Sequence, residues 1–315
     1  MSANDYEYRG MLASTWDLLR GDTSNWPDRA FYRKVIEWSG QPVLDVGCGT
    51  GRLLLDYLAD GIDVEGLDNS PEMLALCREK AEQLGLSPVL YQQPVEAMTL
   101  PRRYRTIIVP SSSFQLLVDP ADAAAAIRRM HDHLEPGGTL VMPFMVLDEH
   151  EDEPIPPSAD GLVRTNWKIS AEAIRPEDGL LVRRWSRSTY DTSAKLEHTE
   201  DRYELLRDGE VIATEEHSRS PATRWYDQQE AVALYRTAGF DDIRVTRWFN
   251  EEPAVGDEGL FCVFGIRGSG IRDWGLGIGD WGHEGRCSVL FPPNPQSLVP
   301  NPHSPTTYRI RRDSR

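Results

Sequence analysis

Strands and helices alternate along residues 42–146, and this alternation limits the fold more than any other feature of the sequence. In two of the intervening segments a capping residue stands before proline, Ser70 before Pro71 and Asp119 before Pro120, which is typical of a helix start. Strands that alternate with helices form a parallel sheet covered on both faces. Short apolar runs predict the strands at 42–46, 62–68, 88–93, 106–110 and 139–146.

Three glycines at alternate positions follow the first predicted strand, in the stretch VLDVGCGTGR at 43–52. Glycine in such a turn lets the backbone approach a ligand and exposes N–H groups at the start of a helix. A dinucleotide fingerprint counted from Gly47 would need glycine where the chain has Arg52. The spacing therefore favours another nucleoside ligand over a nicotinamide cofactor. Asp68, at the end of the second predicted strand, is placed to accept from the ribose hydroxyls.

After the fifth predicted strand the pattern changes to period two. Alternating side chains predict about four antiparallel strands across 162–225, inserted into the α/β core. The Asp208-Gly209 pair between two such runs predicts a hairpin. The chain then returns to a helix at 227–240 and two closing strands. The expected domains are a helical cap at 1–40, the core at 41–147 and 226–267, the inserted sheet at 148–225, and a Gly/Pro-rich, disordered tail at 268–315.

Composition argues against several classes of function. The formal net charge of −16 argues against nucleic acid as the main partner. No apolar run approaches the roughly 18 residues of a membrane-spanning helix, and no secretory signal is expected. We therefore expect a soluble, cytoplasmic protein without a membrane partner. The cysteines have neither the spacing of metal ligands nor that of a disulfide framework, so no metal site is expected. They are Cys48, Cys77, Cys262 and Cys287.

Three motifs occur in order along the predicted core: LDVGCGTG at 44–51, GLDNSPEML at 66–74 and LEPGGTLVM at 134–142. Together they resemble the class I S-adenosylmethionine-dependent methyltransferases. With its inserted strands the chain is similar to small-molecule members, of the amino-sugar N-methyltransferase and glycine N-methyltransferase type. The resemblance implies a Rossmann-like α/β sheet with helices on both faces, an inserted antiparallel β lid, and S-adenosylmethionine as cofactor.

The resemblance also implies roles for individual residues. Asp45 would orient the methionine amino group, Asp68 would hold the ribose, and Asn69 and Met73 would flank the adenine. Met73 is as compatible with a place in the core as with the cofactor wall. The cofactor-binding candidates are Asp45, Gly47, Cys48, Gly49, Gly51, Asp68, Asn69, Met73, Val95, Glu96 and Ser111.

Two positions depart from the family pattern. Pro94 stands where an acidic residue usually meets the adenine amino group, and Thr106 replaces an acid common at the start of the fourth strand. The backbone N–H of Val95 and the carboxylate of Glu96 are the expected substitutes. Within the glycine turn, Cys48 is expected to be a small apolar filler rather than a nucleophile.

The acceptor is expected between the serine-rich turn after the fourth strand and the inserted sheet. In the N-terminal segment, Trp16 and Tyr32 either offer aromatic faces to the sulfonium or pack against the sheet. Alternation puts Arg183, Trp185 and Arg187 on one face of the insert, without telling which face meets the pocket. The substrate-contact candidates are Trp16, Tyr32, Ser113, Phe114, Gln115, Trp167, Trp185 and Trp225.

These patterns predict transfer of a methyl group to a small-molecule acceptor, at nitrogen or oxygen rather than carbon. Because the cofactor brings the reactive group, the protein chiefly supplies proximity and alignment, and no catalytic residue is assigned. His217 is either a base or an ordinary packing histidine. A non-catalytic S-adenosylmethionine-binding protein and a nucleic-acid or protein methyltransferase are the alternatives. A small molecule is the expected partner, and a homodimer is left open.

Overall fold

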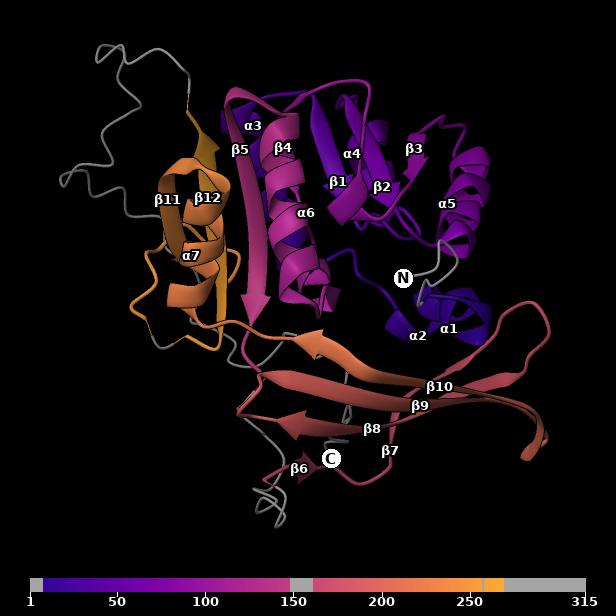
Figure 1. The fold of residues 1–315 in the computed structure, drawn as a ribbon. Coiled ribbons are helices and arrows are strands. Elements are labelled where there is room, and N and C mark those ends of the chain that lie inside the picture. Colours follow the sequence, from indigo (N-terminus) through magenta and orange to yellow (C-terminus); the bar gives the residue numbers. More distant parts are fainter. Residues whose placement is uncertain (1–7, 148–160, 257, 269–315) are drawn as a thin grey trace, which may run out of the picture.

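The computed structural model describes residues 8–147, 161–256 and 258–268, and in these residues the chain forms two β-sheets (Figure 1). A seven-stranded sheet has the order β11-β12-β5-β4-β1-β2-β3. Strands β1 to β5 run parallel, while β12 and β11 close the sheet in antiparallel fashion. Its strands are β1 (Val43–Val46), β2 (Val64–Asp68), β3 (Val89–Gln92), β4 (Tyr104–Ile108), β5 (Leu134–Met145), β11 (Phe240–Arg247) and β12 (Leu260–Arg267).

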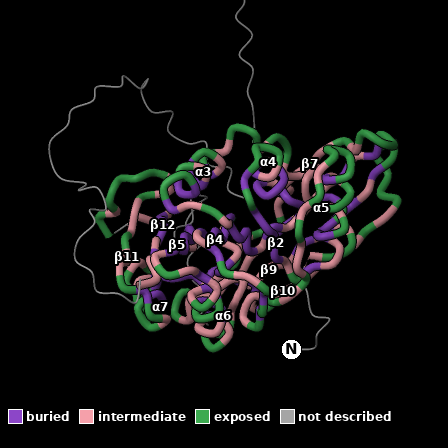
Figure 2. Tube along the Cα trace, turned by 90° about the horizontal axis from the view of Figure 1, so that it is seen from above, coloured by how far each residue is buried: buried purple, intermediate pink, exposed green. Residues whose placement is uncertain are grey.

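Helices cover both faces of this sheet. One core cluster joins the sheet to α6 and α7, and a second joins it to α3, α4 and α5. Seen from above, the buried residues lie along the middle of the sheet and the exposed ones on the outer sides of the helices (Figure 2). The helices are α1 (Gly10–Ser14), α2 (Trp16–Arg20), α3 (Pro27–Ser39), α4 (Leu54–Ala59), α5 (Pro71–Gln83), α6 (Pro120–His133) and α7 (Gln228–Ala238), with short 3-10 turns η1 (Val95–Ala97) and η2 (Ser113–Leu116).

The helix-start signals of the sequence are confirmed by the capping contacts. The Ser70 hydroxyl accepts from Met73 N–H at 3.1 Å, and the Asp119 carboxylate accepts from Ala121 N–H at 2.7 Å. Each contact satisfies a backbone donor that the first turn of a helix leaves without a partner. None of the described helices is both long and apolar enough to cross a bilayer.

The strand order determines where a ligand can bind. β1 lies between β2 and β4, and the chain reverses its direction of strand addition between β1 and β4. In such sheets the loops that leave the carboxyl ends of the two central strands diverge and leave a crevice. Here those loops are the glycine turn after Val46 and the serine turn after Ile108.

The inserted segment forms the second, antiparallel sheet, which lies across the carboxyl ends of the core strands (Figure 1). The hairpin expected at Asp208-Gly209 is confirmed, because both residues have positive φ angles (51° and 85°) and β9 turns there into β10. The described part of the insert holds five strands rather than about four. They are β6 (Val163–Arg164), β7 (Lys168–Ile174), β8 (Leu181–Asp191), β9 (Leu196–Arg207) and β10 (Glu210–Arg224).

Two further expectations differ from the structure or lie outside it. The fifth core strand begins at Leu134, directly after α6, rather than at 139, because Leu134 already pairs with Tyr104 ahead of an irregularity in the ladder. The tail beyond residue 268 lies outside the described residues, as does 148–160.

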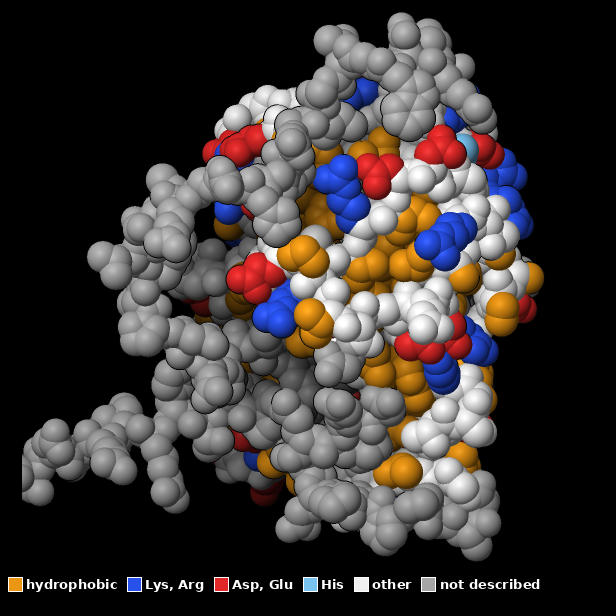
Figure 3. Space-filling view, turned by 90° about the vertical axis from the view of Figure 1, so that its left-hand side faces the viewer, with side chains coloured by type: hydrophobic (Ala, Val, Ile, Leu, Met, Phe, Trp, Pro, Cys, Tyr) orange, Lys and Arg blue, Asp and Glu red, His pale blue; other side chains and the backbone are white. Residues whose placement is uncertain are grey.

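On the face at the β11 edge, hydrophobic side chains gather between scattered acidic and basic ones (Figure 3).

The buried side chain of Gln115 joins the two sheets. Its amide nitrogen donates to the carbonyls of Met145 and Arg224, at 2.8 and 3.2 Å, and its amide oxygen accepts from Met145 N–H at 2.8 Å. Met145 ends β5 and Arg224 ends β10, so one side chain fastens the end of the core to the end of the insert.

Replacing this side chain is expected to weaken the fold. Gln115→Ala should lower the free energy of unfolding by about 2–4 kcal/mol, since it removes three buried hydrogen bonds and leaves a cavity. Urea unfolding followed by circular dichroism measures the change. Gln83→Ala, at an exposed position of α5, is the matched control and should change stability by less than about 0.5 kcal/mol. Equal stability of the two variants would contradict the role of Gln115.

Candidate functional site

The glycine turn after β1 requires glycine at all three positions. Gly47, Gly49 and Gly51 have φ angles of 72°, 55° and 84°. A Cβ atom on Gly47 would lie 2.9 Å from the Ser113 hydroxyl, and one on Gly51 would lie 2.6 Å from the Cys77 sulfur. Backbone conformation at all three positions, and close packing at Gly47 and Gly51, thus disfavour larger residues, and the turn brings bare backbone to the carboxyl edge.

Hydrogen bonds hold this turn against the end of β2. The N–H groups of Gly47 and Cys48 donate to the Leu67 carbonyl at 2.7 and 3.1 Å. The Asp68 carboxylate accepts from the N–H of Gly49 on one oxygen and of Ser70 on the other, each at 2.9 Å. Burial raises the pKa of Asp68, while the backbone donors oppose the shift. Each carboxylate oxygen keeps a lone pair for a further donor.

Asp45 is a buried acid with one carboxylate oxygen left without a hydrogen-bond partner in the described part of the chain. It is the third residue of β1, next to the turn, is 1% exposed, and its Oδ1 atom has no hydrogen-bond partner among the described residues. Burial raises its pKa to about 7. The neighbouring cation, Arg52, lowers that pKa but forms its ion pair with the buried Asp28 instead. A buried carboxylate in this condition is a site for a positively charged ligand group.

Helix α2 lies over the glycine turn. Its Asp17 accepts a hydrogen bond from the Thr50 hydroxyl at 2.8 Å and pairs with Lys80 of α5 at 2.5 Å. Helix α1 connects the two sheets, because Gly10 N–H donates to Glu72 of α5 and Met11 N–H donates to Glu215 of β10. The N-terminal helices therefore close the crevice from one side (Figure 1).

Helix α2 also brings a cation, Arg20, to the glycine turn. The Arg20 guanidinium donates to the Ser111 hydroxyl at 3.1 Å and lies 4.8 and 4.7 Å from the rings of Trp16 and Trp26. Among the described residues no carboxylate lies within ion-pair distance of it. Burial and the charge of Arg52 lower the pKa of Arg20 to about 10. Arg20 is thus a cation prepared for an anionic ligand group.

Sequence analysis missed Arg20, Thr50 and Trp26 as site residues. None lies at a spacing that identifies it, since α2 is only five residues long and is separated from the motifs it covers. The aromatic residues among the first 40 positions indicated that this segment contacts the cofactor, and Trp16 was predicted on that basis.

The adenine-side candidates lie at the ends of β2 and β3, which are neighbouring strands. Met73 is buried, with its methyl carbon 3.5 Å from a Cβ placed on Gly49, while Asn69 is exposed. Val95 and Glu96 are half-buried in η1, directly after β3. They therefore flank the same end of the crevice as Asp68.

Several candidates instead have roles in packing. Burial raises the pKa of the Cys48 thiol well above its usual value, as for a small apolar filler. Tyr32 is fully buried against Phe31 and Phe249, so it does not cap the cofactor. Phe114 packs between Phe144 and Tyr226, and the polar atoms of Gln115 are used by the backbone. Thr106, the departure on the fourth strand, donates to the Gly40 carbonyl.

The tryptophans of the insert do not line the crevice. Tyr203 pairs with both Arg184 and Glu215, and Glu215 contacts α1, so this set marks the inner face of the sheet. By alternation Arg183, Trp185 and Arg187 lie on the outer face, and Trp167 joins them because Arg187 stacks on its ring. Trp225 is buried beneath α6 and α7.

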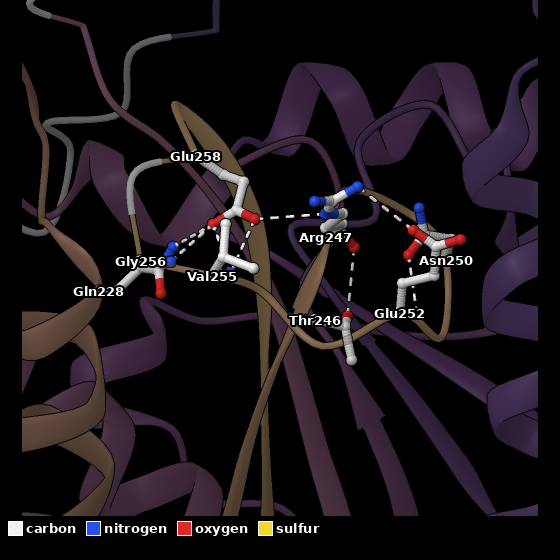
Figure 4. Close-up of polar contacts among 8 residues, drawn as sticks. All are labelled: Gln228, Thr246, Arg247, Asn250, Glu252, Val255, Gly256 and Glu258. Atoms are coloured by element: carbon white, nitrogen blue, oxygen red, sulfur yellow. Dashed lines mark hydrogen bonds and ion pairs between the residues drawn. The ribbon is translucent and has the colours of Figure 1, made fainter. Parts of the chain in front are cut away.

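The connection between β11 and β12 borders the same edge of the core sheet. Figure 4 shows the Glu258 carboxylate accepting from the N–H groups of Val255 and Gly256, from Gln228 and from Arg247. The backbone donors, Val255 foremost, together with Gln228 lower the pKa of Glu258 to about 2. The stability that ionised Glu258 contributes is therefore present above its ordinary pKa and lost only as the pH falls towards about 2.

Comparisons with known proteins agree with this geometry. The sequence matches the family described as a methyltransferase domain over residues 43–138. It is 31% identical over 177 residues to a demethylmenaquinone methyltransferase of Thermus thermophilus, covering 54% of this chain and 74% of that protein. The chain belongs to the class I S-adenosylmethionine-dependent methyltransferases. The members of this family bind S-adenosylmethionine.

The chain is also similar to two proteins whose names refer to amino sugars. This methyltransferase is 31% identical over 142 residues to a dTDP-3-amino-3,6-dideoxy-alpha-D-glucopyranose N,N-dimethyltransferase of Streptomyces fradiae, covering 43% of this chain and 54% of that protein. The chain thus spans about half the length of that curated relative. The structure of CalS10 with S-adenosylmethionine, an amino pentose methyltransferase from Micromonospora echinaspora, has the same fold (TM-score 0.55, 24% identity, 84% of this chain and 99% of that one).

The charges at the glycine turn of this methyltransferase fit the cofactor. The methionine part of S-adenosylmethionine carries an ammonium and a carboxylate. A buried carboxylate with one oxygen unpartnered (Asp45) and a guanidinium without an acidic partner among the described residues (Arg20) flank the turn, and Asp68 has lone pairs left for ribose hydroxyls. We therefore propose that Asp45 binds the ammonium, Arg20 the carboxylate and Asp68 the ribose.

The role proposed for Asp45 predicts how cofactor binding depends on pH. Asp45 has a pKa of about 7 in the free protein and must be ionised to pair with an ammonium. The affinity for S-adenosylhomocysteine should therefore rise between about pH 5.5 and 7, by up to about tenfold per pH unit. Calorimetry in two buffers should detect proton release at the acidic end. Asp45→Asn should bind weakly with a flat pH profile, and an unchanged slope in that variant would exclude the assignment.

The second prediction concerns Arg20. Arg20→Gln should weaken S-adenosylhomocysteine binding about 10- to 100-fold, because a charge-assisted contact to the carboxylate is lost. Arg33→Gln is the matched control, since Arg33 lies on α3 and pairs with Asp60 away from the turn. Decarboxylated S-adenosylmethionine should bind the wild type and Arg20→Gln equally. If Arg20→Gln reduced the affinity for that analogue as well, Arg20 would not be the carboxylate partner.

Proposed function

We propose that this chain transfers the methyl group of S-adenosylmethionine to the amine of a small, hydroxyl-rich acceptor of the amino-sugar class. One observation carries the proposal. The insert turns a polar, hydrogen-bonding face towards the crevice that holds Asp45, Arg20 and the glycine turn. Relatives that act on amino sugars by name, such as the Streptomyces fradiae enzyme, support the same acceptor class.

Four polar side chains of the insert form one network. The buried Asp201 accepts from the Arg184 guanidinium at 2.9 Å and from the Ser186 hydroxyl. The hydroxyls of Ser186 and Ser170 lie 2.9 Å apart. Side chains held in this way present fixed donors and acceptors, which suits a ligand with several hydroxyl groups. An extended apolar ligand such as a quinone would cover this polar face without hydrogen-bonding to it, and this disfavours the acceptor named for the Thermus thermophilus relative.

His217 is the titratable group of this face best suited to handle a proton. Among the four histidines that the structure describes, it is the one on the inner face. Its ring nitrogen lies 2.6 Å from the Glu215 carboxylate, and its ring packs edge-on against Tyr203. A carboxylate in this position fixes the orientation of the ring.

The chemistry then divides between cofactor and protein. When bound, S-adenosylmethionine supplies a methyl group activated by its positively charged sulfur. Asp45, Arg20 and Asp68 hold the two ends of the methionine part and the ribose in place, so that alignment provides most of the rate. The inserted sheet excludes water from the crevice. An acceptor amine must be neutral to attack, and we assign its proton, or that of the methylated product, to His217.

An acceptor screen tests the proposal. Full-length protein is incubated with labelled S-adenosylmethionine and paired acceptors: nucleotide-linked and free amino sugars, and the same sugars with hydroxyl in place of the amine. We expect mass spectrometry to detect methylated product from the amine member of a pair alone. Product from the hydroxyl sugars, with none from any amine, would overturn the acceptor class.

His217→Gln separates proton handling from folding. It should lower kcat/KM for the amine acceptor about 10- to 100-fold below neutral pH and less at alkaline pH, where the amine is already neutral. S-adenosylhomocysteine affinity should be unchanged. His198→Gln, on the outer face beside Ser220, is the matched control. A pH-independent loss in His217→Gln would mean that His217 only positions other groups.

A further inference from the structure

A second cavity lies away from the cofactor crevice, between helices α6 and α7. It has a volume of about 280 Å³ and lies where the chain leaves β10 of the inserted sheet and enters α7 of the core. Neither the glycine turn nor Asp45 takes part in it. Its lining comprises Ala124, Ile127, Arg128, Lys195, Arg224, Trp225, Tyr226, Glu230, Ala233, Leu234, Thr237 and Ala238.

The cations around this groove differ in how they are compensated. Lys195 is neutralised by Asp227 and Glu230, at 2.9 and 2.7 Å. Within the described part of the chain, Arg224 donates only to backbone carbonyls, those of Val118 and Ala194. Arg128 is exposed and makes neither a hydrogen bond nor an ion pair with any described residue. In a chain of net charge −16, two guanidiniums without an acidic partner on one groove favour an anion.

The rest of the lining is apolar. Small and aliphatic side chains of α6 and α7 form the walls, among them Ala124, Ile127 and Leu234. The lining also includes two aromatic residues, Trp225 and Tyr226, which are 2% and 8% exposed. The Tyr226 hydroxyl is buried and has no hydrogen-bond partner among the described residues. The groove thus combines an apolar interior, cations and an unsatisfied hydroxyl, the composition expected of a small-molecule site.

We propose that this groove binds a small organic anion, a carboxylate on an apolar chain or ring. The carboxylate pairs with Arg128 and Arg224, and the apolar part lies between α6 and α7. The site is separate from the cofactor crevice, and its occupant is a second ligand in addition to cofactor and acceptor.

The position of the groove gives such a ligand a route to the inserted sheet. Trp225 N–H donates to the Lys195 carbonyl at 3.2 Å, and Arg224 donates to the Ala194 carbonyl at 3.1 Å. These contacts fasten the β8–β9 turn of the insert to the strand that leads into α7. Since the ligand contacts the same residues, we expect it to change the KM for the acceptor while leaving cofactor affinity unchanged; this consequence rests on the proposed function.

Binding is tested on the full chain with octanoate as the probe, by titration calorimetry and Trp fluorescence. We expect one saturable site for octanoate and no saturable binding of octanol or octylamine. Saturating S-adenosylhomocysteine should not displace octanoate. Binding that requires an empty cofactor crevice, or that octanol matches, would overturn the proposal, and so would the absence of octanoate binding.

Two variants locate the site. Arg128→Gln should weaken octanoate binding about tenfold or more, because it removes one of the two cations. Arg129→Gln, the next residue of α6 and exposed outside the groove, is the matched control and should bind as the wild type does. Ala124→Phe should abolish binding by filling the groove, with thermal melting as the check on folding. Equal octanoate affinity in the two arginine variants would refute the site whether or not methyl transfer is found.

Discussion

The close approach of the glycine turn to the end of β2 is the constraint on which the rest of the site depends. The N–H groups of residues 47–49 are taken up by the Leu67 carbonyl and the Asp68 carboxylate, so the turn can occupy only one position. This position leaves the Asp45 carboxylate buried beside bare backbone, with one oxygen unsatisfied. A free carboxylate held there is costly in the isolated fold and favourable once a cation arrives, which links folding of the turn to binding of the cofactor.

The electrostatic arrangement around this turn is divided between two parts of the chain. The acid comes from the first core strand, whereas the cation, Arg20, comes from a short helix that contacts the turn through Asp17 and Thr50. Helix α2 is too short to be stable alone and depends on these contacts. The cap and the turn therefore form a single binding unit, although they lie far apart in the sequence.

The two faces of the inserted sheet carry different kinds of side chain. Its inner face carries a hydrogen-bonded network around Asp201 and the His217–Glu215 pair, and it faces the N-terminal helices and the crevice. Its outer face carries arginines stacked on Trp167 and Trp185. Stacking gives these arginine and tryptophan side chains favourable contacts with one another, so they need no ligand to be stable there. Consequently Trp167 and Trp185, which suggested an acceptor roof in the sequence, belong to the opposite surface, and the polar residues of the inner face carry the proposed acceptor contacts.

The sequence by itself determined the α/β core, the insertion, the glycine turn and the acids that flank it, because these depend on local periodicity, on helix caps and on conformations that only glycine adopts readily. It also determined that Arg183, Trp185 and Arg187 share a face. Only the tertiary structure decided which face meets the crevice, that Tyr32 and Gln115 belong to the interior, and that Arg20 reaches the turn. The physical reason is that alternation sets which side chains point the same way, whereas the packing of distant segments sets what they point towards.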